Sequence, residues 1–295
     1  MYEALADFLQ DSEIRIVNDN LHFRMLPAIA KNYDHGMYDK AVDFWTDLVA
    51  EISKIGIISP DKKKKAFYIY FVPDDFYSHM SGYENILAKP ELGADADGFV
   101  YALCYLQQAL LPGAQTDKLN LFNRVTKLHE LSHLVHSDFG NNPFWFAEGV
   151  AELVPWHLLG YEKRIPTHLK WMRALPQIYT LKDFNDGIGF SREQVGKKIP
   201  SYRTGYVSIY LITRAMVLGI ATKLKISPVD ALQKFLGLWH GAGAMSANEF
   251  TELCANVAGM DAHQLIYTTD YQKMVLDDIQ KEITSGQQLQ QGRTI

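Results

Sequence analysis

The sequence predicts an α+β fold: a small mixed sheet in an N-terminal lobe, followed by a mainly α-helical C-terminal lobe. At 295 residues the chain is long enough for two lobes. Segments typical of strands occur between residues 66 and 111, whereas almost everything from about Tyr202 onward has helical spacing. We expect the lobes to span residues 1–140 and 141–295, with a frayed tail after Ser285.

The first elements of the N-terminal lobe follow from apolar periodicity. Apolar residues from Tyr38 to Ile55 recur at three- and four-residue steps, which predicts an amphipathic helix. Ala66–Val72 is aromatic and β-branched and is stopped by Pro73, as a strand would be. Two further strands are predicted, one around Gly98–Ala102 and one within Leu103–Leu111.

Two helices are expected in the middle of the chain. Helical spacing runs from Thr116 or Asp117, either of which would serve as an N-cap, to about residue 137. A second helix is predicted to start at Pro143 with Asn142 as its cap, because proline is tolerated in a first turn. Pro155 should kink or end this helix, since it lacks a backbone N–H.

The C-terminal part has its own helix signals. Ser227–Pro228 and Ser246 are expected helix starts. The most apolar long segment, Val207–Leu224, carries Arg214 and Lys223 and is therefore predicted to be a buried helix rather than a membrane span.

Composition excludes several classes of protein. Apolar residues make up 47% and charged residues 21%, values typical of soluble globular proteins rather than of disordered, fibrous or membrane-embedded chains. The chain has 29 basic and 34 acidic residues and a net charge of -5, which argues against a nucleic-acid partner. The basic run Lys62–Lys65 is interpreted as a solvated loop.

Cysteine usage and the N-terminus bear on the compartment. Cys104 and Cys254 lie in different halves of the sequence and support neither a disulfide framework nor a thiolate zinc site. The first residues carry acids where a secretion signal needs a basic region followed by an apolar stretch. We therefore expect a reducing cytoplasm, although a trimmed chain would have the same features.

The pattern that indicates chemistry is His129-Glu130-Leu131-Ser132-His133, an HExxH motif within the helix predicted independently from periodicity. Histidines four residues apart project from one helix face, so both imidazoles can reach one zinc ion. Glu130, one step along, is placed to act as a base toward a water molecule. The motif therefore predicts a site for one Zn²⁺ ion with His129 and His133 as ligands.

A catalytic zinc needs a third protein ligand, and two candidates lie downstream. His136 is the nearer, but three ligands from one straight helix fit a tetrahedral ion poorly. Glu148 is favoured, because its carboxylate lies in an otherwise apolar run on the next helix, beside Gly149, which suits close helix packing. Glu152, one turn further, is a candidate to orient a ligand histidine; a plain surface salt bridge is the alternative.

These residues resemble those of the gluzincin metallopeptidases. HELSH, followed after fourteen residues by the glutamate of WFAEGVAE, is similar to the aminopeptidase-like branch, whose third ligand lies in a W-x-x-E-G-x-A segment. The resemblance covers roughly residues 98–219. It implies an edge strand over the HExxH helix, for which Gly98–Ala102 is the expected segment, and an oxyanion-binding tyrosine. Tyr202 in Tyr202-Arg203-Thr204-Gly205 matches that tyrosine, with Tyr206 and Tyr210 as competitors.

Two departures limit what the resemblance implies. A G-x-M-E-N segment upstream of the zinc helix, which holds the free amine of an aminopeptidase substrate, is absent, and the spacing to Glu148 is short. The expected activity is zinc-dependent hydrolysis of peptide bonds in a peptide or protein substrate, with cleavage at an end or internally left open. The alternatives are a zinc hydrolase of another bond, and an inactive binding or scaffold protein that retains the metal.

Overall fold

The computed structural model describes residues 10–18, 21–25, 35–53, 55, 67–72, 88–91, 101–106, 124–133, 143–160, 180–185, 199–240, 245–270, 277 and 280. The chain divides into two compact units, Met1–Asp138 and Phe139–Ile295. The first unit contains a sheet, and the described part of the second is helical.

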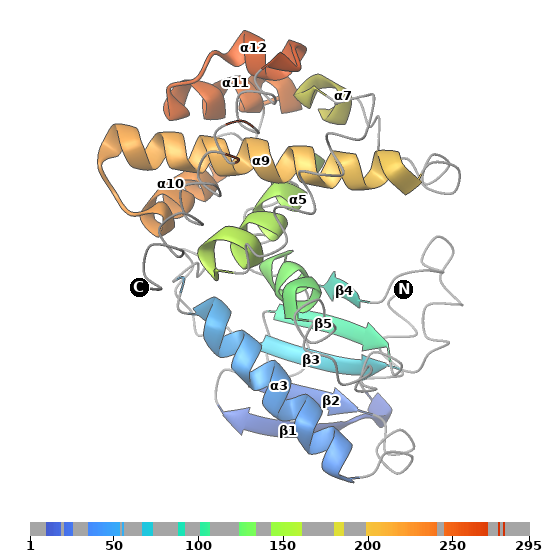
Figure 1. The fold of residues 1–295 in the computed structure, drawn as a ribbon. Helices are drawn as coiled ribbons and strands as arrows, with labels where there is room; N and C mark the ends of the chain where they lie inside the picture. The colour runs from blue at the N-terminus through green and yellow to red at the C-terminus, as the bar shows by residue number, and fades with distance from the viewer. Residues whose placement is uncertain are drawn as a thin grey trace, which may run out of the picture. The chain divides into compact units, whose positions relative to one another are not determined.

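The first unit contains a five-stranded mixed sheet in the order β1-β2-β3-β5-β4 (Figure 1). Its strands are β1 (Glu13–Asn18), β2 (Leu21–Met25), β3 (Phe67–Val72), β4 (Ala88–Glu91) and β5 (Tyr101–Leu106). The hairpin β1-β2 and the pair β4-β5 are antiparallel, whereas β2-β3 and β3-β5 are parallel. The small mixed sheet expected for the N-terminal part is therefore present.

Helix α3 (His35–Ser53) connects the parallel strands β2 and β3 and lies across the sheet (Figure 1). Parallel strands need such a crossover connection, because a tight turn would bring the chain back antiparallel to the first strand. The predicted apolar face is buried, with Trp45 1% and Leu48 0% exposed. On β2, Phe23 is 0% exposed, and its neighbour Arg24 is also buried at 7% exposure, so both faces of this strand are covered. The periodicity prediction for this helix is confirmed.

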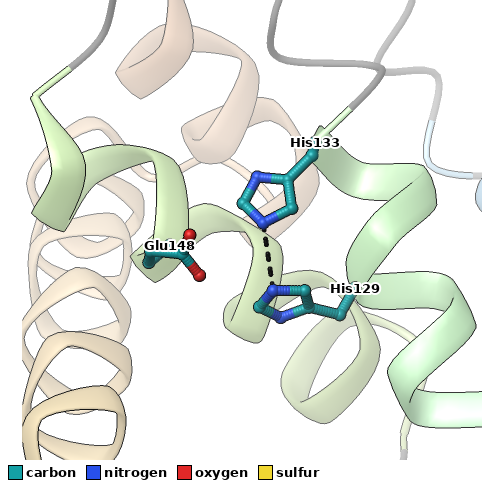
Figure 2. A group of neighbouring side chains, drawn as sticks. All are labelled: His129, His133 and Glu148. Atoms are coloured by element: carbon teal, nitrogen blue, oxygen red, sulfur yellow. Dashed lines mark hydrogen bonds between the residues drawn. The ribbon is translucent and has the colours of Figure 1, made fainter. Parts of the chain in front are cut away.

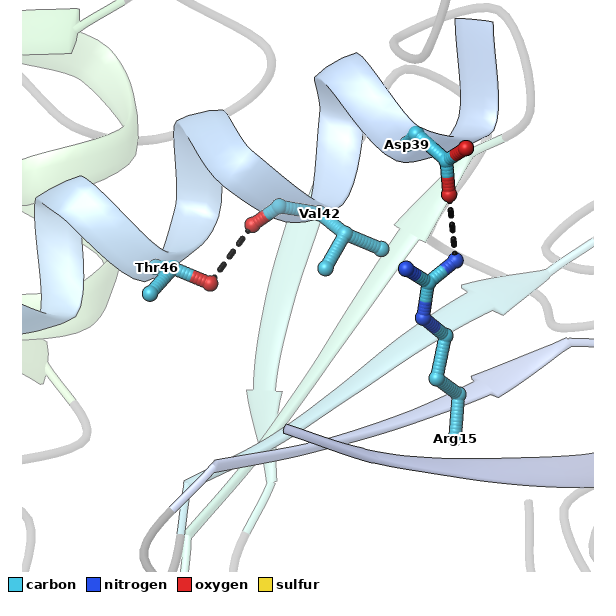
Figure 3. A network of polar contacts seen from close by, with 4 residues as sticks. All are labelled: Arg15, Asp39, Val42 and Thr46. Carbon is cyan, nitrogen blue, oxygen red and sulfur yellow. Dashed lines mark hydrogen bonds and ion pairs between the residues drawn. The ribbon is translucent and has the colours of Figure 1, made fainter. Parts of the chain in front are cut away.

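An exposed ion pair links α3 to the hairpin, and a further hydrogen bond lies within α3 itself (Figure 3). Arg15 on β1 donates from Nη1 to Asp39 Oδ1 on α3 over 2.6 Å. Within α3, the hydroxyl of Thr46 donates to the carbonyl of Val42 one turn earlier, which satisfies a polar group on a largely apolar face.

Two strand predictions need correction. The two strands expected at Gly98–Ala102 and Leu103–Leu111 are replaced by one, β5, and residues 98–100 and 107–111 lie outside the described residues. Nor is β5 the edge strand, because it pairs with both β3 and β4. The edge strands are β1 and β4, and the sequence of β4, AKPE, consists of residue types that are depleted in strands. Pro90 suits an edge strand, because proline has no backbone N–H to donate to a neighbouring strand.

In the second unit, helices pack around the long helix α9, which begins at Ile199, three residues before the expected start (Figure 1). The helical segments are α5 (Phe144–Leu153), η2 (Val154–Leu158), α7 (Leu181–Asn185), α9 (Ile199–Leu224), α10 (Pro228–His240), α11 (Ala247–Ala258) and α12 (Ala262–Tyr267). Trp145, Phe146, Phe235 and Phe250 form a fully buried aromatic cluster that joins α5, α10 and α11, with ring centroids 5.0–6.5 Å apart.

Local signals account for several helix ends. Ser246 and Glu249 form the reciprocal hydrogen bonds of a capping box at the start of α11, and Ser227 accepts from the backbone N–H of Asp230 at the start of α10. Both predicted starts are confirmed. The short helix α7, capped by Thr180 and Asp183, was not expected.

The ends of α5 confirm one prediction and correct another. Pro143 itself is the N-cap and no side chain caps this end, whereas Asn142 lies outside the described residues. The α-helix stops at Leu153 and continues as one turn of π-helix containing Pro155, as expected where a proline removes an N–H donor.

Among the described residues, no helix is long and apolar enough to cross a membrane, and much of α9 is buried by protein instead. The lysine run at residues 62–65 and the tail after residue 285 lie outside the described residues.

Candidate metal centre

The helix over residues 124–133 carries the HExxH motif and is amphipathic. Val125, Leu128, Leu131 and Ser132 are buried on one face. The hydroxyl of Ser132 donates to the carbonyl of Leu128 at 2.6 Å, so this polar group needs no other partner. The opposite face, with His129, Glu130 and His133, is only partly buried. The helix is thus held by its apolar face and leaves His129, Glu130 and His133 partly accessible to solvent and ligands.

Charged residues at the other end of this helix contact α3. Arg124 Nη2 lies 2.6 Å from Glu51 Oε1. Lys127 is only 7% exposed, and its ammonium lies over the rings of Phe44 and Trp45, 4.7 Å and 5.6 Å from their centroids. Burial lowers the pKa of Lys127 to about 8, while the aromatic faces favour its charged form.

Glu148 lies on α5, between residues that anchor the helix. Trp145 and Phe146 before it and Val150 and Ala151 after it are 0–1% exposed. Glu148 and Glu152, one turn apart, are partly buried and share a face. The carboxylate of Glu148 is therefore carried by a helix whose other faces are packed in the core.

His129, His133 and Glu148 form a group that could hold a metal ion (Figure 2). One ligand atom from each lies within 4.8 Å of the others. The two Nε2 atoms are 3.0 Å apart, and the imidazole planes are steeply inclined at 80°. In the absence of a metal this contact is a hydrogen bond, with donor and acceptor set by the tautomers.

The donor set and spacing fit zinc. Two nitrogen ligands about 2.0–2.1 Å from a tetrahedral ion stand about 3.3 Å apart, close to the observed separation of the two Nε2 atoms. Imidazole and carboxylate ligands are those found in catalytic zinc sites, although they also accept other divalent transition metals.

The remaining predicted site residues are placed as follows. Glu130 directly follows His129 on the partly buried face, and Glu152 lies on α5. Tyr202 and Tyr206 lie in α9, but their side chains are not among the described ones, whereas Tyr210 is 2% exposed. His136 falls outside the described residues. The roles predicted for Tyr202 and Glu152 stay predictions.

Sequence reasoning missed the residues that support the site. Thr213 and Ile209 on α9 face Gly149, the residue after Glu148. Arg124 and Lys127 hold the histidine-bearing helix against α3. A signal was available for Lys127, because it lies in the period of the buried face, where a charged residue is rare unless it is partnered.

Comparison with models of protein families, with curated proteins and with solved structures finds no match for this chain. The side chains at the candidate metal centre are therefore the basis for a functional proposal.

Proposed function

We propose that the protein is a zinc-dependent peptidase in which His129, His133 and Glu148 hold one zinc ion. The observation that carries the proposal is the convergence of these three ligand groups, with a glutamate immediately after the first histidine. Two imidazoles and one carboxylate leave a fourth position open, which is the arrangement of a catalytic rather than a structural zinc.

A zinc ion held by His129, His133 and Glu148 would polarise a carbonyl oxygen and would lower the pKa of water into the neutral range. Glu130 acts as general base: its carboxylate takes one proton from the attacking water while the carbon–oxygen bond forms. Glu130 then passes this proton to the amide nitrogen as the carbon–nitrogen bond breaks. The products are a carboxylic acid and an amine, and Glu130 returns to its ionised form.

Two further residues complete the proposal. Tyr202 donates a hydrogen bond to the oxyanion that develops on the substrate carbonyl, a contribution of about a hundred- to a thousandfold in turnover in comparable sites. Glu152 accepts a hydrogen bond from the second imidazole nitrogen of a ligand histidine and so fixes its orientation. The partly buried face with His129, Glu130 and His133 supports access for a peptide.

Metal content and one matched pair of variants test the proposal. The purified protein should contain about one zinc per chain by mass spectrometry of the elements. Glu130→Gln should keep the zinc but lose at least about a hundredfold in peptide turnover, because the base is removed. Glu148→Gln should lose zinc. Glu252→Gln, at an exposed position on α11, is the control and should change neither quantity.

The rival functions give different results in the same experiment. A zinc-loaded protein that hydrolyses esters but no peptide would indicate a hydrolase of another bond, because the motif determines water activation and not the bond cut. A zinc-loaded protein inert toward all substrates would favour a binding or scaffold role. Absence of zinc, or full peptide turnover by Glu130→Gln, would overturn the proposal.

A further inference from the structure

Gly149, the residue after the proposed ligand Glu148, lies at a close approach of α5 to α9. A β-carbon at Gly149 would overlap the hydroxyl oxygen of Thr213, and would lie 2.8 Å from Ile209 Cγ2 and 3.0 Å from Thr213 Cβ. Thr213 and Ile209 are both 0% exposed, so neither side chain can move into solvent. The close approach of α5 to α9 thus requires glycine at this position.

This contact bears on the metal ligand through the geometry of the helix. Successive residues of an α-helix point about 100° apart, so the face pressed against α9 at Gly149 determines the direction in which Glu148 projects. Relief of the overlap at Gly149 would need a shift of α5 of roughly 1 Å, since ordinary carbon contacts are longer than 3.4 Å. Metal–ligand distances tolerate only about 0.2 Å.

We propose that Gly149, packed against Thr213 and Ile209, is a positioning residue that sets the carboxylate of Glu148 for metal binding. The inference rests on the proposed zinc site and names the contact that makes Glu148 a ligand. The hydroxyl of Thr213 is buried with no hydrogen-bond partner among the described residues. Such a group is costly to bury, and here its oxygen occupies the space that any larger residue at 149 would need.

The inference is tested by measuring two quantities for each variant: its zinc affinity, by competition with a chromophoric chelator, and its melting temperature. Gly149→Ala should weaken Zn²⁺ binding at least tenfold. In that background Thr213→Ala removes the overlapping oxygen and should restore much of the affinity. Thr213→Val keeps the bulk and should not.

Gly219→Ala separates positioning from general stability. A β-carbon at Gly219 would lie 2.6 Å from the carbonyl oxygen of Ala258, so this change disturbs the packing of α9 on α11 instead. It should lower the melting temperature but leave zinc affinity unchanged. If Gly149→Ala alone does not fold, the double variant Gly149→Ala/Thr213→Ala is compared with Thr213→Ala alone. The double variant should bind zinc somewhat more weakly, because its added methyl group still meets Ile209 Cγ2.

The outcomes distinguish this inference from the function on which it rests. Wild-type protein that binds zinc, together with a folded Gly149→Ala variant of unchanged affinity, would overturn the positioning role alone. Equal losses of affinity in Gly149→Ala and Gly219→Ala would reduce the contact to a general packing effect and would also overturn it. A wild-type protein that binds no zinc would overturn the proposed function itself.

Discussion

Arg124 donates from Nη2 to Oε1 of Glu51 over 2.6 Å, and this ion pair joins the HExxH-bearing helix to α3. A second pair of the same length, Arg15 with Asp39, joins β1 to α3. The two differ in burial: the side chains of the first are 24% and 26% exposed, those of the second 43% and 59%. Because solvent screens exposed charges, equal distances should have unequal energetic effects.

Glu51→Gln should therefore lower the free energy of unfolding by about 1–2 kcal/mol, because it weakens a half-buried, charge-assisted hydrogen bond. Asp39→Asn should cost less than about 0.5 kcal/mol. Urea unfolding of both variants, at low and high salt, measures the difference. If Asp39→Asn lowered the free energy of unfolding as much as Glu51→Gln or more, burial would not explain the contribution of the Arg124–Glu51 pair.

Elements with one apolar face could be predicted from the sequence, because their spacing reflects the core that they contact. The face of α3 around Trp45 and Leu48 is one example, and the helix with His129 and His133 is another. The cap at Ser246 was also predictable, since it depends on residues three apart. Two of the three proposed ligands follow from such local spacing alone.

Contacts that depend on distant partners could not be predicted. The strand β1 has Ile14 and Ile16 40% and 64% exposed, so it lacks a buried face from which to be recognised. β4 is a strand only because it pairs with β5. Thr213 was not identified as the neighbour of Gly149, because the rotation of α9 about its axis is set by the packing of several helices together.

The capping box of α11 should make stability depend on acidic pH. Hydrogen bonds from the backbone and the hydroxyl of Ser246 lower the pKa of Glu249 from its usual 4.5. A carboxylate whose pKa is lowered by folding stabilises the protein above the unfolded-state pKa, and this contribution is lost as the pH falls through the lowered value.

The advantage of wild type over Glu249→Gln in unfolding free energy should thus be constant at neutral pH and shrink as the pH falls below 4.5. Ser246→Ala should cost about 1 kcal/mol at neutral pH, as other N-cap losses do. Unfolding curves at several pH values test both. An advantage that grows on acidification would contradict the direction of the pKa shift.

Cys254 on α11 should resist alkylation in the folded protein. Its thiol is free and 0% exposed, and burial raises its pKa, so that both access and thiolate formation are suppressed. In a Cys104→Ser background, which leaves this single thiol, iodoacetamide at pH 8 should react with the folded protein at least about a hundredfold more slowly than with the protein unfolded in urea.

The contact of α11 with α9 should control this protection. Ala258, one turn after Cys254, faces Gly219, so Gly219→Ala should speed the reaction by making α11 easier to open. Labelling followed by mass spectrometry measures both rates, and rapid modification of the native protein would show that the α9–α11 contact opens far more readily than its packing implies.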